Sequence, residues 1–216
     1  MTLPLPLRNR LAELILDSLH DPTARTVLSM LVRFCHEPER LMASPGVPAE
    51  FPLELFDNRA GRLALKGAYR RFEDEFCERT VRAWEVVRDR PLAGRDPGLA
   101  DVLDEAADLF DARLFFEVHE LLEPYWMRAD GAAREALQGL IQIAVGFQHL
   151  ANHNLDGALM LLEEGMAKVE GKKLEGRDLG RFAAAVGGAR GAIVALGKDA
   201  PWTFDWGVMP RFPRGG

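Results

Sequence analysis

Apolar residues recur at helical spacing along almost the whole of this 216-residue chain, and this periodicity restricts its fold more than any other feature. Alternating apolar and polar runs bounded by hairpin turn residues are nearly absent, so the chain offers little evidence for strands. The pattern predicts an all-α protein, most simply an antiparallel helical bundle whose neighbouring helices are joined by short loops.

Prolines and glycines divide this helical pattern into two parts. In the first part the spacing predicts helices over residues 7–20, 22–36 and 61–88, and the prolines between the last two predict a long loop over residues 37–58. A second cluster of prolines and glycines lies at residues 90–98 and indicates a domain boundary. We therefore expect an N-terminal helical extension or small domain over residues 1–95.

The second part predicts a helical bundle over residues 96–200, with an aromatic and proline-rich tail over 201–216. Five helices are expected, over residues 99–110, 111–126, 131–151, 155–169 and 178–196. Asp111 is expected to cap the second of them. The tail is expected to fold back onto the bundle, although a tail that binds a partner would have much the same composition.

The composition indicates a folded protein, since 48% of the residues are hydrophobic and 28% are charged. The formal net charge of −6 argues against a general nucleic-acid binder, which needs clustered cations to neutralise phosphates. The first residues do not resemble a signal peptide, and no later apolar run is judged long enough and sufficiently uncharged to span a bilayer, so no membrane insertion is expected. These features predict a cytoplasmic protein, whereas its oligomeric state does not follow from them.

Cys35 and Cys77 lie far apart and form no CxxC pair, so their spacing predicts neither a zinc knuckle nor a disulfide framework. We expect reduced, buried thiols.

A polar group of side chains interrupts two otherwise apolar helices of the predicted bundle. On a helical projection His119 and Glu123 lie together at the edge of the apolar face, Glu120 lies further around, and Glu117 points toward water. In the next helix a narrow polar stripe is flanked by Gly139 and Gly146, which would let another backbone or a ligand approach closely. The stripe contains Gln138, Gln142 and His149.

Three chemistries could use this group. A divalent metal ion could be held by imidazole and carboxylate, with the ligands His119, Glu120, Glu123 and His149. In an acid–base enzyme His119 would transfer the proton, Glu123 would orient it, and Glu120 would be a ligand or a second carboxylate. The third is a small-molecule pocket whose polar or aromatic walls are Glu120, Trp126, Gln138, Gln142 and His149. The alternative to all three is a structural or protein-interaction scaffold in which the polar seam only fixes helix packing.

The combined motifs resemble the bacterial family catalogued as domain of unknown function 309, over about residues 99–170. The resemblance is carried by the run from Leu109 through His119-Glu120-Leu121-Leu122-Glu123 to Trp126, then by Gln138-Gly139-Leu140-Ile141-Gln142 and by residues 154–159. It implies a small all-helical protein and no established activity. His153-Asn154 departs from the usual Gly-Asn turn of that family, and residues 1–95 fall outside the resemblance.

Overall fold

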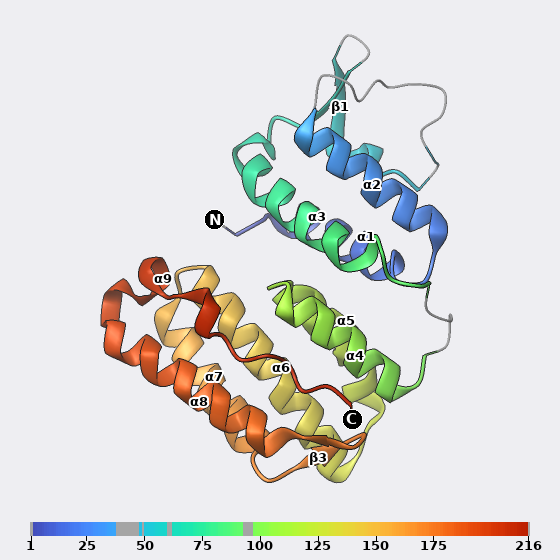
Figure 1. Cartoon of the computed structure of the whole chain (residues 1–216). Helices are drawn as coiled ribbons and strands as arrows, with labels where there is room; N and C mark the ends of the chain where they lie inside the picture. The colour runs from blue at the N-terminus through green and yellow to red at the C-terminus, as the bar shows by residue number, and fades with distance from the viewer. Residues whose placement is uncertain (1, 38–47, 49, 60–61, 93–96, 216) are drawn as a thin grey trace. The chain divides into compact units, whose positions relative to one another are not determined.

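The computed structural model describes residues 2–37, 48, 50–59, 62–92 and 97–215. It divides the chain into two compact units, Met1–Asp96 and Pro97–Gly216. α-Helices make up most of both units (Figure 1), and the sheets among the described residues are two short two-stranded ones. The all-α prediction is confirmed.

Three helices form the N-terminal unit: α1 (Leu5–Asp17), α2 (Pro22–His36) and α3 (Glu73–Val87). α2 contacts both of the others. It begins at a proline, and the Asp21 carboxylate accepts the N–H groups of Thr23 and Ala24 at 2.6 and 3.1 Å. A capped N-terminus of this kind stabilises a helix by about 1 kcal/mol. The Asp21-Pro22 pair therefore sets the start of α2 at the residue that the sequence predicted.

A β-hairpin replaces the beginning of the long helix predicted over residues 61–88. Strands β1 (Phe56–Arg59) and β2 (Arg62–Leu65) pair antiparallel, with Phe56 opposite Leu65. Phe56 is buried against Phe34 of α2 and Phe76 of α3, at ring-centroid distances of 5.1 and 6.4 Å. The prediction is wrong here because strands of four residues are too short for alternation to be told from helical spacing.

Short 3-10 turns flank the hairpin, η1 at Leu53–Leu55 and η2 at Arg70–Phe72. Most of the loop predicted over residues 37–58 lies outside the described residues, as does part of the segment predicted as a boundary at 90–98.

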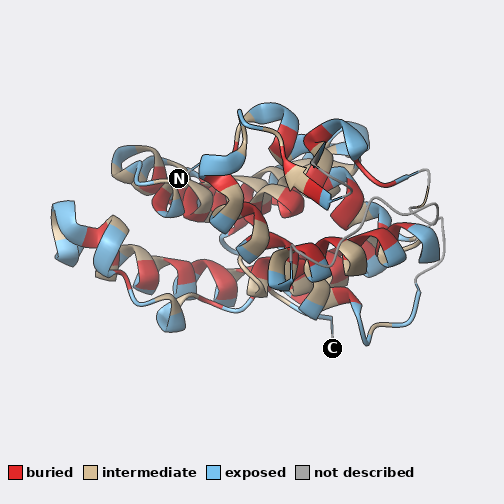
Figure 2. Cartoon of the chain, turned by 90° about the horizontal axis from the view of Figure 1, so that it is seen from above, coloured by how far each residue is buried: buried red, intermediate tan, exposed pale blue. Residues whose placement is uncertain are grey.

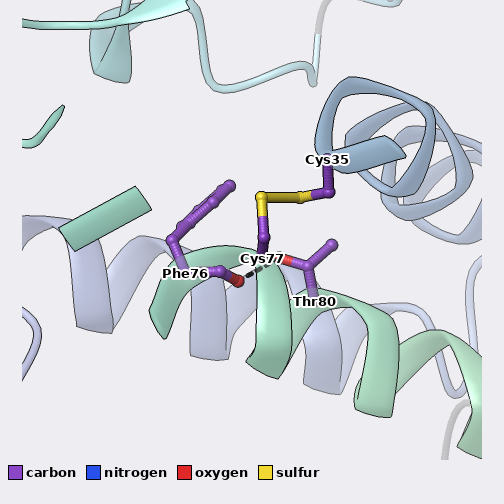
Figure 3. Close-up of a disulfide and its surroundings, with 4 residues drawn as sticks. All are labelled: Cys35, Phe76, Cys77 and Thr80. Carbon is purple, nitrogen blue, oxygen red and sulfur yellow. Dashed lines mark hydrogen bonds between the residues drawn. A yellow bond between two sulfur atoms is a disulfide. The ribbon is translucent and has the colours of Figure 1, made fainter. Parts of the chain in front are cut away.

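Cys35 of α2 and Cys77 of α3 form a disulfide, with their Cα atoms 5.3 Å apart (Figure 3). The expectation of reduced thiols is therefore wrong. The two cysteines are 42 residues apart in sequence, and they meet because α2 and α3 pack side by side. The spacing of the cysteines in the sequence does not show which helices pack together, so it could not predict this bridge. Beside the bridge, Thr80 donates its hydroxyl to the Phe76 carbonyl at 2.7 Å.

In the C-terminal unit, successive helices pack against one another in the order in which they occur in the chain. They are α4 (Leu99–Asp111), α5 (Phe115–Arg128), α6 (Gly131–Ala151), α7 (Leu155–Val169) and α8 (Leu179–Leu196). Short loops join the first four, and the hairpin of β3 (Lys173–Leu174) and β4 (Arg177–Asp178) joins α7 to α8. Figure 2 shows buried residues as stripes along these helices, as expected for amphipathic elements around a core.

The core of this unit is aromatic. Phe110 contacts the rings of Phe115, Phe147, Phe182 and Phe212 at centroid distances of 5.3 to 5.9 Å. Phe212 belongs to the C-terminal segment, which returns along the bundle (Figure 1) after η3 (Gly197–Asp199), α9 (Ala200–Thr203) and η4 (Trp206–Val208). This segment therefore supplies part of the core.

Polar contacts hold the same segment to the end of α4. The Phe212 N–H donates to Asp111, and Arg214 pairs with Asp108 and Asp111 at 2.8 and 3.1 Å. Asp111 was expected to cap the following helix. Instead it accepts hydrogen bonds from the C-terminal segment, and α5 begins after Leu114 without a side-chain cap.

One helical stretch among the described residues, Leu179–Thr203, is long and apolar enough to cross a bilayer when judged by length and composition alone. This stretch corrects the expectation that no such run exists. Its main helix, α8, packs on α7 and buries Phe182, Val186 and Ile193, and 33% of its apolar window is buried.

Candidate functional site

One turn of α5 gathers the histidine and two of the carboxylates that the sequence singled out. The Nδ1 atom of His119 lies 3.0 Å from Glu120 Oε1, and its Nε2 atom lies 3.9 Å from Glu123 Oε1. Residues four apart on a helix share a face, so the His119–Glu123 approach follows from the spacing alone. The imidazole therefore lies between two carboxylates that it meets through different nitrogens.

These three residues also form the one cluster of potential metal ligands found within the described part of the chain. One ligand atom from each lies within 4.8 Å of the other two. The side chains keep 29%, 38% and 41% of their exposure, so solvent reaches all of them. Two carboxylates beside one imidazole give the turn a negative charge, which favours a cation.

The contact between Glu120 and His119 assigns a role that differs from the sequence analysis. Glu123 was expected to orient the imidazole, but Glu120 makes the closer contact, 3.0 Å against 3.9 Å. When the Glu120 carboxylate accepts the Nδ1–H, the Nε2 lone pair is directed outward, near Glu123. Metal-binding histidines commonly have this arrangement, with a carboxylate on the nitrogen that does not bind the ion.

The two glutamines of the polar stripe are not part of this cluster. Gln142 of α6 donates its amide to Glu164 of α7 at 2.7 Å, so it joins those two helices. Its carbonyl oxygen is buried, and no hydrogen-bond partner for it occurs among the described residues. Gln138 is half-buried and makes no side-chain hydrogen bond within the same residues.

His149 also lies apart from the cluster, at the end of α6. Its Nδ1 atom is 2.8 Å from the side-chain nitrogen of Asn154, and the Asn154 oxygen accepts the N–H of Gly157 to cap α7. A Cβ on Gly157 would come within 2.6 Å of the Asn154 amide and 3.0 Å of His149. The family-like positions around residue 154 thus form a helix–helix turn. The group of potential metal ligands found among the described residues contains His119, Glu120 and Glu123 but not His149.

Trp126 occupies the far end of α5. The guanidinium of Arg134 lies 4.7 Å from the centre of its ring and donates to the carbonyls of Trp126, Met127 and Ala129. These contacts close the C-terminus of α5, where such carbonyls lack helical partners. α5 also continues through Pro124 to Arg128.

The glycines flanking the polar stripe serve helix packing. A Cβ on Gly139 would lie 2.8 Å from the carbonyl oxygen of Gly165, and one on Gly165 would lie 2.8 Å from that of Gly139. A Cβ on Gly146 would lie 2.9 Å from Cγ of Leu162 and 3.1 Å from the backbone nitrogen of that residue. The sequence allowed either a backbone or a ligand to approach these glycines. In the structure it is the backbone of α7 that approaches them.

Two buried acids were missed by the sequence analysis. Glu117 was predicted to face water but is fully buried, as is Glu105 of α4. The helical projection erred because α5 packs on both α4 and α6, so its buried face is wider than one neighbour requires. Buried carboxylates need polar partners, and both residues take part in polar interactions.

Comparison with known families gives one match. Residues 103–161 match the model of a family described as Domain of unknown function (DUF309). The match contains the α5 cluster, Gly139 and the Asn154 turn, and it extends from α4 into α7. No curated protein and no solved structure was found to match the chain.

Proposed function

We propose that this chain, which carries a DUF309 segment at residues 103–161, binds a divalent metal ion on α5. The observation behind the proposal is the cluster of His119, Glu120 and Glu123, whose ligand atoms lie within 4.8 Å of one another. Imidazole together with carboxylate suits first-row ions such as zinc, manganese and iron.

The spacing of two side chains in the cluster is close to that of direct coordination. Metal–nitrogen and metal–oxygen bonds of roughly 2.0–2.2 Å in tetrahedral geometry hold two ligand atoms about 3.4 Å apart. His119 Nε2 lies 3.9 Å from Glu123 Oε1, so the two side chains must close by about 0.5 Å to bind one ion. In this proposal these two atoms bind the ion, and Glu120 holds the imidazole by its Nδ1–H. Water or a substrate would complete the coordination, because the side chains are partly exposed.

An open site of this kind can polarise a carbonyl or phosphoryl oxygen or lower the pKa of a bound water. We therefore favour hydrolytic chemistry if the protein is an enzyme. The ion and a small molecule are the proposed partners, since the net charge of −6 disfavours nucleic acid.

The first test is elemental analysis of untagged, full-length protein purified without chelator, followed by calorimetric titration with zinc and manganese. We expect near-stoichiometric metal in the parent and its loss in His119→Ala and Glu123→Gln. Glu163→Gln is the matched control, because Glu163 is also a helical glutamate but pairs with Arg190. Zinc at about 100 times its Kd should stabilise the parent by about 2.7 kcal/mol. Metal-free parent protein that also fails to bind added ions contradicts the proposal.

A second candidate is a metal-independent acid–base pair, favoured by the 3.0 Å contact between His119 and Glu120. With the Nδ1–H donated to Glu120, Nε2 is the nitrogen that would accept a proton from a substrate. In that case His119→Ala removes activity while added metal changes nothing. A purely structural scaffold is the remaining alternative, and it predicts that His119→Ala lowers stability and abolishes no ligand effect.

A cytoplasmic location, expected from the sequence, stays a proposal. The Cys35–Cys77 disulfide weighs against this, because disulfides persist mainly in oxidising compartments. Alkylation of thiols in intact cells before lysis tests the location: Cys35 and Cys77 that are alkylated at once fit a reduced cytoplasmic protein, whereas cysteines that react only after reduction fit an oxidising compartment.

A further inference from the structure

A hollow of about 290 Å³ lies in the C-terminal unit between the end of α4 and the C-terminal segment. It is lined by Asp111, Arg113, Trp206, Gly207, Met209 and Arg211. None of these residues belongs to the cluster on α5. The volume is at the lower end of the range for small-molecule sites, so only a small ligand would fit.

The backbone at Arg113 gives the first reason to regard the hollow as a site. α4 ends in a Schellman-type turn, in which Leu114 donates its N–H to the Leu109 carbonyl and Arg113 donates to Phe110. Arg113 is the residue in the left-handed conformation, with φ = 59°. Glycine is usual at that position, and another residue there is strained. A strained residue that is not glycine directs attention to its side chain.

The guanidinium of Arg113 lies 5.8 Å from the centre of the Trp206 ring. No ion pair of Arg113 occurs among the residues that the structure describes. Trp206 is held by Phe115, Phe147 and Phe204, at centroid distances of 6.0, 6.4 and 5.3 Å. The hollow thus combines a fixed aromatic wall with a cation that has no carboxylate of its own.

The one acid in the lining, Asp111, is already committed. Its Oδ1 accepts the Phe212 N–H and its Oδ2 pairs with Arg214 at 3.1 Å. Burial lowers the pKa of Arg214, but hydrogen bonds and charge from Asp108 and Asp111 outweigh it and raise that pKa. Arg211, whose side chain is 80% exposed, makes a longer ion pair of 3.6 Å with the same Oδ2. The guanidinium groups of Arg113, Arg211 and Arg214 therefore meet only the carboxylates of Asp108 and Asp111 in the ion pairs among the described residues, which leaves an excess of positive charge at the hollow.

We propose that this hollow binds a small aromatic oxyanion, with Arg113 and Arg211 pairing with the charged group and Trp206 lying against the ring. Arginine suits carboxylate and phosphate because its planar fork donates two parallel hydrogen bonds. Both anions share this chemistry, so the experiment has an arm for each.

The test is calorimetric titration of full-length protein with phenyl phosphate, benzoate, inorganic phosphate and the neutral analogue benzyl alcohol. We expect saturable binding of phenyl phosphate or benzoate, with the tighter of the two identifying the anion. Inorganic phosphate should bind more weakly, because it cannot contact Trp206. Absence of saturable binding by both aromatic anions up to about 10 mM overturns the proposal, and so does benzyl alcohol binding as tightly as benzoate.

Arg113→Gly separates a binding role from a structural one. Glycine relieves the left-handed strain, so the variant should be at least as stable as the parent while its Kd for the aromatic anion rises about ten-fold or more. Arg113→Asn, which also tolerates this conformation, should behave alike, and Arg211→Gln should weaken binding too. Arg181→Gln, at a side chain that is 92% exposed, is the control and should bind as the parent does. Unchanged affinity in Arg113→Gly overturns the proposal.

Discussion

The contact between Gly139 of α6 and Gly165 of α7 predicts that one substitution has opposite effects at two glycines. A Cβ on Gly139 would lie 2.6 Å from Val169 Cγ1, 2.8 Å from the Gly165 carbonyl oxygen and 2.9 Å from the Cβ of Lys168. A Cβ on Gly188, in the exposed middle of α8, would meet nothing within 4 Å. We therefore compare Gly139→Ala with Gly188→Ala.

Both substitutions gain the helix propensity of alanine, which stabilises the fold by about 1 kcal/mol. Gly188→Ala should show that gain unopposed. Gly139→Ala must also push one backbone away from another, and overpacking of this kind costs about 1–3 kcal/mol. Since helix propensity contributes equally to both variants, the difference between their free energies of unfolding isolates the steric cost. We expect this cost to be about 2–3 kcal/mol, because one of the three close contacts is with the main chain.

The assay is urea denaturation of the full-length protein followed by far-UV circular dichroism, with Gly191→Ala as a second open-space control. In thermal melts the same difference should separate the two variants by about 4–12 °C. The reasoning is refuted if Gly139→Ala is as stable as the parent, or if the free energies of unfolding of the two variants agree within about 0.5 kcal/mol.

Three further predictions concern stability. Replacing Cys35 and Cys77 by serine opens a loop of 42 residues and should lower the free energy of unfolding by about 4 kcal/mol on the chain-entropy model; denaturation with and without reductant measures this, and no change would mean that the bridge does not form. Asn154→Ala removes the cap of α7 and should cost about 1 kcal/mol in urea denaturation. Burial, followed by the charge of Glu13, raises the pKa of Asp17 above its ordinary value of 3.8. The protonated carboxyl is therefore favoured in the folded state. This contribution to stability is complete below pH 3.8 and is lost as pH rises through the higher folded-state pKa. Asp17→Asn should therefore stabilise the protein at neutral pH, with the gain disappearing in acid, and a gain independent of pH would contradict this.

The helices of the C-terminal unit could be predicted because their signals are local. α6 and α7 have the bounds expected from apolar periodicity and from the polar turn at residues 152–154. The hairpin at residues 56–65 was missed, since its pairing of Phe56 with Leu65 depends on burial against α2 and α3. That burial is a tertiary effect, and it outweighed the helical spacing.

The candidate site also has local contacts, which the sequence predicts, and contacts between helices, which it does not. The approach of His119 to Glu123 follows from their spacing of four on one helix, and the structure has it. The contacts of Gln142 with Glu164 and of His149 with Asn154 depend on how α6 meets its neighbours. A single sequence shows which residues are polar on a helix, but the register between helices decides which of them meet.

The disulfide between α2 and α3 also changes what a cut in the chain would do. A protease that cleaves one peptide bond between residues 36 and 76 separates the chain into two polypeptides, yet the Cys35–Cys77 bridge still joins them. The cut protein would migrate near its full mass until it is reduced. In the N-terminal unit, α2 and α3 are therefore joined by two covalent connections, the backbone and the disulfide.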